Sequence, residues 1–142
     1  VEVVFVVTVM ITNVFSLDKV WEWYHKYHRK QASIAMTNVV VTPAYLNIAY
    51  IPTELKQKAL DKIADIPASV MWPLEVRKQD PDKFDYQTGI EDIRKGLQRE
   101  VDQEIAEKNW NYFLQYTRDL DKLRSTDTFA EIPELQEYLK EQ

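Results

Sequence analysis

Residues 1–12 read VEVVFVVTVMIT, and this stretch decides the fold class. Nearly every residue in it is β-branched or aromatic, which favours a strand over a helix. The apolar residues form an almost continuous run instead of alternating with polar ones. That pattern is typical of a parallel strand covered on both faces, so we expect residues 1–12 to be a buried strand of an α/β fold. The alternative interpretation is an aggregation-prone terminal stretch.

The overall composition indicates one globular domain. The chain has 142 residues, of which 45% are apolar and 29% charged, enough to build its own core. Residues 1–78 hold nine Lys or Arg against seven Asp or Glu, whereas residues 79–142 hold nine against sixteen. A nucleic-acid-binding protein is expected to carry a basic face, so we predict no nucleic-acid partner.

Two scarce residue types exclude further classes of site. The chain has no cysteine, which excludes disulfides and thiolate-bound metal clusters, and only two glycines, which exclude a glycine-rich phosphate loop. The longest apolar run, residues 3–11, is too short to span a bilayer. Glu2 also stands where a signal peptide has basic residues. We therefore expect a cytoplasmic protein with no membrane partner.

The first half of the chain predicts alternating helices and strands. Ser16 precedes an amphipathic helix over residues 17–30, and Thr53 is a plausible N-cap for a helix over residues 53–66. Between these helices, residues 39–42 predict a second strand that Pro43 ends. Alternating apolar residues over 45–51 predict a third strand.

The second half of the chain predicts helices after a break. Three prolines and a polar run make residues 67–85 a linker or long loop. Apolar residues then recur at helical spacing over 90–105 and 110–123, and a last short helix over 132–139 begins near Pro133. The predicted division is thus 1–66 for strands and helices, 67–85 for the linker, and 86–142 for the helical C-terminal region.

The predicted sheet is incomplete within this sequence. A parallel strand that is apolar on both sides needs neighbouring strands and helices on both faces. The chain offers only two further short strands, both downstream of the first. We therefore expect the missing partner strands to lie upstream, outside these 142 residues.

Polar residues at the end of the first strand are the candidate ligand-binding groups. In parallel α/β folds, ligands bind at the carboxyl ends of the strands. Thr12 and Asn13 lie at that end, and Thr8 would share a strand face with Thr12. Asn13 is the best single candidate, although an asparagine that only forms a turn remains an open interpretation.

Other chemistry has weaker support. Glu22 and His25 form one Glu-x-x-His unit, which di-iron bundles use in pairs, so a histidine on a helix flank is the simpler interpretation. The four serines lack the Gly-x-Ser-x-Gly setting of a nucleophile. The carboxylate pair Asp119 and Asp121 is most simply a solvated face. We predict no catalytic residue and no metal ligand in this chain.

Three stretches together resemble the radical SAM superfamily, specifically its twitch- or SPASM-type proteins. Residues 12–21 (TNVFSLDKVW) are similar to the end of the sixth strand and the following helix of the family's partial barrel. Residues 43–52 resemble the segment that leaves the barrel. Residues 112–124, with LDKLR, and residues 132–135, with IPEL, resemble the family's C-terminal ending. Ser125 replaces the glycine that this ending has after its arginine.

The resemblance implies a fold and an activity for an intact parent protein. The fold would be α/β, the C-terminal part of a partial (β/α)6 barrel followed by C-terminal helices. The parent would bind a 4Fe-4S cluster and S-adenosylmethionine, and would cleave the latter reductively to a 5′-deoxyadenosyl radical. The cluster and auxiliary-cluster cysteines are absent here, so this chain alone holds neither cofactor. By resemblance, Thr8, Thr12 and Asn13 would line the cofactor or substrate cavity.

The partners implied are the upstream half of the same barrel and a small-molecule or peptide substrate. A second hypothesis is a non-catalytic α/β interaction module. Its docking surface would be the aromatic helix that contains Trp21, Trp23, Tyr24 and Tyr27. A Glu-x-x-His metal protein is a third hypothesis.

Overall fold

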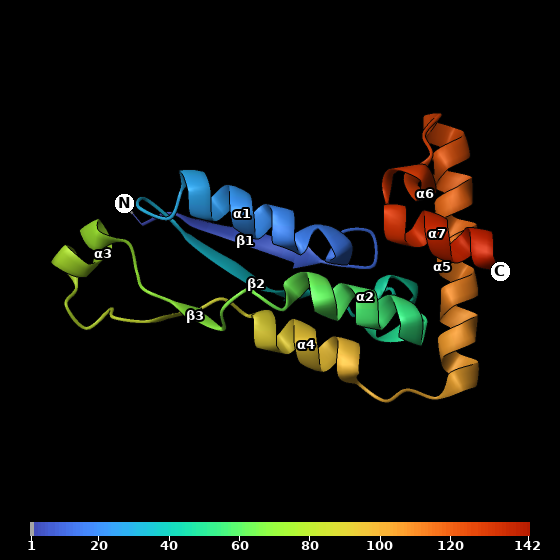
Figure 1. Cartoon of the computed structure of the whole chain (residues 1–142), viewed down its shortest axis with the longest axis horizontal. Helices are drawn as coiled ribbons and strands as arrows, with labels where there is room; N and C mark the ends of the chain where they lie inside the picture. Colours follow the sequence, from blue (N-terminus) through green and yellow to red (C-terminus); the bar gives the residue numbers. More distant parts are fainter. Residues whose placement is uncertain (1) are drawn as a thin grey trace.

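A computed structural model describes residues 2–142, so Val1, the first residue of the predicted strand, lies outside the described part. The chain is a mixed α/β protein (Figure 1). Its main elements in chain order are β1 (Val4–Val9), η1 (Val14–Ser16), α1 (Leu17–Tyr27), β2 (Ser33–Val39), η2 (Ala44–Leu46), η3 (Ile48–Tyr50), α2 (Thr53–Ile63), β3 (Ser69–Val70), α3 (Leu74–Gln79), β4 (Tyr86–Gln87), α4 (Ile90–Gln98), α5 (Gln103–Arg124), α6 (Thr128–Glu131) and α7 (Pro133–Glu141).

The first strand is parallel, as its composition predicts. β1 pairs with β2 in parallel, with Phe5 opposite Ile34 and Thr8 opposite Asn38. The register shifts between Val6 and Thr8. Parallel neighbours need a crossover connection, and α1 supplies it, so β1, α1 and β2 form one βαβ unit.

The two faces of β1 differ in how far they are buried. On the covered face, the Phe5 ring packs edge-on against Trp23 at 5.2 Å and against His28 at 5.1 Å between ring centroids. On the opposite face, Val4 and Val6 of β1 are 37% and 61% exposed, although their register partners on β2, Ser33 and Ala35, are 1% and 8% exposed. The prediction of a strand buried on both faces is therefore wrong for β1 within residues 2–142, because its Val4–Val6–Thr8 side, here called the uncovered face, is exposed.

The other two strand predictions are wrong in position or type. The second strand is Ser33–Val39, not 39–42, because the register with β1 and the full burial of Ile34 and Met36 outweigh the β-branched run that follows. Residues 45–51 form no strand; most of them lie in two short 3-10 helices, η2 and η3. There the buried side chain of Asn47 accepts a hydrogen bond from the Ala49 amide at 2.9 Å, which bends the chain.

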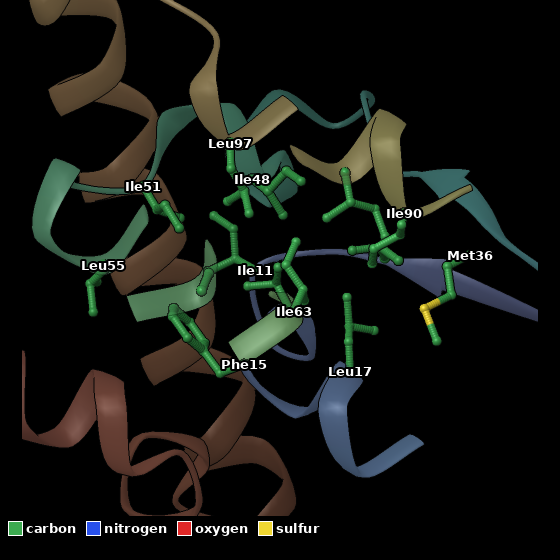
Figure 2. Close-up of a cluster of buried hydrophobic side chains, with 14 of the residues drawn as sticks. Ile11, Phe15, Leu17, Met36, Ile48, Ile51, Leu55, Ile63, Ile90 and Leu97 are labelled. Carbon is green, nitrogen blue, oxygen red and sulfur yellow. The ribbon is translucent and has the colours of Figure 1, made fainter. Parts of the chain in front are cut away.

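The core lies between the covered sheet face and the helices, and Figure 2 shows its centre. The apolar spacing of Leu55, Ala59, Leu60 and Ile63 predicts one buried face for α2; Leu55, Ala59 and Ile63 are fully buried there, and Leu60 is partly buried. α2 ends at Ile63, three residues earlier than predicted. The Arg94 guanidinium of α4 donates to the carbonyl oxygens of Ile63 at 3.2 Å and Ile66 at 3.0 Å, so it caps that end.

The C-terminal region is helical as predicted, but its first helix ends at Gln98 instead of continuing to residue 105. α4 and α5 are separated by residues 99–102, where the side chain of Asp102 accepts a hydrogen bond from the Ile105 amide at 3.0 Å and caps α5. α5 stands across the end of the molecule toward which β1 points (Figure 1), and it packs on η2 and η3. Residues 67–85 are more ordered than a linker, since they contain β3 and α3.

The end of α5 shows a structural role for Asp121, which corrects its interpretation as part of a solvated face. Its carboxylate accepts hydrogen bonds from Thr126 Oγ1 at 2.8 Å and from Thr128 Oγ1 at 2.7 Å. Partial desolvation alone would raise the pKa of Asp121, but the hydrogen bonds from Thr128 and Thr126 and the nearby Arg124 charge outweigh it, so the pKa is lowered. Asp121 therefore closes the turn after α5.

Replacing Ser125 by glycine is expected to stabilise the protein. Ser125 has a left-handed backbone, with φ 55° and ψ 43°, a conformation that glycine adopts without steric cost. Relief of that strain outweighs the greater unfolded-state entropy of glycine, and we expect a gain of about 0.5–1 kcal/mol in the free energy of unfolding. Urea denaturation measures it. Ser16→Gly is the control: Ser16 has φ −117° and no side-chain capping bond, so that change should lower stability.

Candidate functional site

The carboxyl ends of β1 and β2 place two polar side chains together on the uncovered sheet face. Thr8 and Asn38 are opposite each other in the register, and both are exposed. The Asn38 amide donates a hydrogen bond to Thr8 Oγ1 at 3.4 Å. Val4 and Val6 lie on the same face, nearer the amino end of β1. The uncovered face is thus apolar at one end and polar at the end where parallel α/β folds bind ligands.

Asn13 has its side-chain amide bonded to the local backbone. The Met10 amide donates to Asn13 Oδ1 at 2.9 Å, and Asn13 Nδ2 donates to the Thr8 carbonyl oxygen at 2.7 Å. Both polar atoms of the side chain therefore hold the turn that follows β1. This geometry favours the turn-forming interpretation of Asn13, and a ligand contact from it stays a prediction.

Thr12 does not share a strand face with Thr8. β1 ends at Val9 and residues 11–13 form a turn, so the two-residue periodicity used to pair these threonines stops before Thr12. Thr12 is half-buried in that turn. Two of the three predicted residues, Thr8 and Asn13, are therefore linked by the hydrogen bond from the Asn13 side chain to the Thr8 carbonyl oxygen. Thr12, the third, is adjacent to Asn13 in sequence but takes no part in this bond.

Asn38 is the site residue that sequence reasoning missed. The sequence predicts the second strand at residues 39–42, which do not include Asn38. The predicted strand therefore gives no pairing of Asn38 with Thr8. A sequence signal marks Asn38 itself, although not its pairing with Thr8: Thr37 and Asn38 are polar residues close to an apolar run, the same feature that marks Thr8 and Asn13.

A groove of about 780 Å³ lies between α2, the α4–α5 connection, α5 and α7. Aromatic side chains of Trp110 and Tyr138 form part of its wall. Lys56 also lines it; burial lowers the pKa of its amine, and its Nζ lies 3.4 Å from the Arg99 carbonyl oxygen. No sheet residue lines this groove, so it is separate from the Thr8–Asn38 pair.

A second groove, of about 530 Å³, lies between α1, α2 and α7 and is lined by paired charges. Lys62 contacts Glu134 at 3.1 Å and Asp18 at 3.7 Å between nitrogen and oxygen atoms. The hydrogen bond to Glu134 and its charge raise the pKa of Lys62. Lys58 contacts Glu137 at 2.9 Å. These ion pairs join the three helices.

The Glu-x-x-His unit lies on α1. His25 Nε2 is 3.2 Å from the Arg29 guanidinium on the next turn of the chain. Within residues 2–142, no group of three or more His, Asp or Glu side chains is placed to hold a metal ion. The helices of the same residues include none with the length and apolar character needed to cross a bilayer.

Comparison with known proteins adds no relative: no family model, curated protein or solved structure matches the chain significantly.

Proposed function

We propose that the chain is the C-terminal part of a partial (β/α)6 barrel in a radical SAM protein, and that it supplies one wall of the cavity of that barrel. The observation that carries the proposal is the exposed face of β1, opposite the face that packs on α1. In a (β/α) barrel, helices cover the outer face of the strands, and the opposite face lines the interior. The uncovered face with Val4, Val6 and Thr8 has the character of such an interior face.

The order of side chains along this face supports the same proposal. Barrel interiors are packed with branched apolar residues, and ligands bind at the carboxyl ends of the strands. Val4 and Val6 are the branched residues here, and Thr8 with Asn38 forms the polar end. β1 also has one edge without a partner strand among residues 2–142, since β2 is its only neighbour. Strands of the upstream barrel half would pair with that edge.

The residues of this chain can contact one of the two proposed cofactors, S-adenosylmethionine, but cannot hold the other, the 4Fe-4S cluster. A 4Fe-4S cluster needs thiolate ligands, and the chain has no cysteine, so it does not hold the cluster. S-adenosylmethionine presents hydroxyl, amine and carboxylate groups, which the Thr8 hydroxyl and the Asn38 amide can hydrogen-bond. When bound, the two cofactors together supply the radical chemistry. This chain contributes the wall and the polar pair, and Asn13 holds the turn beside them.

The test uses the intact protein that includes this chain, purified anaerobically and supplied with iron and sulfide. We expect the visible absorption of a 4Fe-4S cluster and the formation of 5′-deoxyadenosine when S-adenosylmethionine and a reductant are added. An intact protein with neither property would overturn the proposal.

Substitutions in the polar pair test the role of this chain within that protein. Thr8→Val and Asn38→Ala should each weaken S-adenosylmethionine binding by about tenfold, which corresponds to about 1.4 kcal/mol for a lost hydrogen bond. Thr53→Val is the matched control, because Thr53 is an exposed threonine on α2, outside the sheet. Unchanged binding in both sheet variants would remove the polar pair from the site.

The interaction module is a second candidate function, favoured by the exposure of two aromatic residues on α1. Trp23 and Tyr27 are 43% and 59% exposed, although Tyr24 on the same helix is buried. Exposed aromatics are enriched at protein interfaces. Absence of the cluster from the intact protein, together with a binding partner lost in a Trp23→Ala variant, would favour this function over the first.

A further inference from the structure

α5 carries an exposed apolar stripe along its length. Ile105, Tyr112, Tyr116 and Leu123 are 50%, 55%, 42% and 84% exposed. At 3.6 residues per turn, all four lie within about 20° of one line along the helix. Trp110, Phe113 and Thr117 occupy the buried face instead. Single exposed apolar residues need no explanation, but four in line on one helix mark an interaction surface.

The stripe is self-complementary about Leu114. Ile105 and Leu123 are equally far from Leu114 in the sequence, and so are Tyr112 and Tyr116. If a second α5 lies antiparallel to the first, with the two-fold axis near this midpoint, then Ile105 faces Leu123 of the second copy. Tyr112 likewise faces Tyr116. A two-fold interface requires this kind of pattern, because each contact occurs twice.

The charges beside the stripe follow the same two-fold pattern. Glu104, Lys108, Asp119 and Lys122 lie on one flank of the stripe at helical spacing. In an antiparallel helix pair, each flank meets the same flank of the other helix. Lys108 then faces Asp119 of the second copy, and Glu104 faces Lys122. Every facing pair has opposite signs, and complementary flanking charges set orientation and register.

We propose that the stripe is a homodimer interface, on which a second copy of this chain packs its own α5 antiparallel. The stripe from Ile105 to Leu123 is about 27 Å long, which suits a pair of straight helices. A single helix pair is at the small end of stable interfaces, about 1,200 Å², so the dimer should be reversible. This inference does not depend on the radical SAM proposal.

Sedimentation or light scattering over a range of concentrations tests the interface. We expect the intact protein to form a dimer of twice its monomer mass that dissociates on dilution. Tyr112→Glu and Leu123→Glu should each weaken the dimer at least tenfold, because the new carboxylates would be buried against apolar side chains. Gln103→Glu is the matched control: it adds the same charge to an exposed position about 160° around the helix from the stripe and should leave the dimer intact.

A charge swap tests the antiparallel orientation. Lys108→Glu alone, or Asp119→Lys alone, puts like charges opposite each other twice and should weaken the dimer. The double variant should restore it. The two residues are about 16 Å apart on one helix and do not contact each other within a chain, so rescue requires a second copy.

The proposal is overturned by a monomer at all concentrations or by a dimer that Tyr112→Glu and Leu123→Glu leave unchanged. Weakening in both single charge variants without rescue in the double variant would also overturn it. Circular dichroism confirms that each variant folds, which we expect because all the substituted positions are exposed.

Discussion

Gly89→Ala is expected to lower the free energy of unfolding by about 2–5 kcal/mol, a large part of the stability of an ordinary domain. Gly89 has φ 81°, in the left-handed region where a side chain is unfavourable. A Cβ atom there would lie 2.5 Å from Thr37 Cγ2 and 2.9 Å from the Met36 carbonyl carbon. The second contact is with backbone of β2, so a rotamer change cannot relieve it.

The position of Gly89 explains why the Gly89→Ala change should destabilise the whole fold and not only the turn before α4. The Met36 amide donates to the Thr88 carbonyl oxygen at 2.7 Å, so the chain before α4 lies directly against β2. The buried Thr88 hydroxyl in turn donates to the Pro67 carbonyl oxygen at 2.7 Å. Moving Gly89 away from β2 would break these bonds and displace Ile90, which is fully buried at the start of α4.

Urea denaturation followed by tryptophan fluorescence measures this loss, at one protein concentration for all variants. Gly96→Ala is the matched control, since it adds the same methyl group to the chain's other glycine. Gly96 lies inside α4, and its Cβ would meet only the Cδ1 atom of Ile48 at 3.3 Å and Cγ1 at 3.5 Å. Better helix propensity offsets this contact, so stability should change by less than about 1 kcal/mol. Equal losses in both variants would contradict the argument from backbone contact.

Phe113→Ala is expected to lower the free energy of unfolding by about 3–5 kcal/mol. Phe113 is fully buried on α5, with its ring centroid 5.2 Å from that of Trp110 and 6.2 Å from that of Phe129. Truncation leaves a cavity where α5 joins the core and α6, and the ring contacts are lost as well. The C-terminal helices should therefore loosen before the sheet does.

Tryptophan fluorescence and hydrogen exchange together measure this result. Trp110 is 8% exposed and stacks on Phe113, so its emission should shift toward that of solvated tryptophan in the variant. Amides of α5 and α7 should lose protection more than those of β1 and β2. Asn111→Ala, at an exposed position on α5, should change neither measurement. Uniform loss of protection over the whole chain would show that α5 does not loosen separately.

Local sequence was sufficient to predict most of the helices. The apolar spacing of Leu55, Ala59 and Ile63 identified the buried face of α2, and Pro133 marked the start of α7. These features depend on residues within a few positions of each other, so the side-chain pattern and the proline geometry determine them. The parallel character of β1 was also predictable, because its apolar run has no clean alternation.

The strand positions and the candidate site were decided only by contacts between distant residues. Residues 39–42 have the stronger β propensity, yet β2 is Ser33–Val39, because Ile34 and Met36 reach the core only in that register with β1. The same register brings Asn38 to Thr8 across thirty positions of sequence. Strand propensity depends on what a strand packs against, so no local pattern could place that pair. The absence of cysteine could be read from sequence alone, whereas the uncovered sheet face became visible only in the tertiary structure.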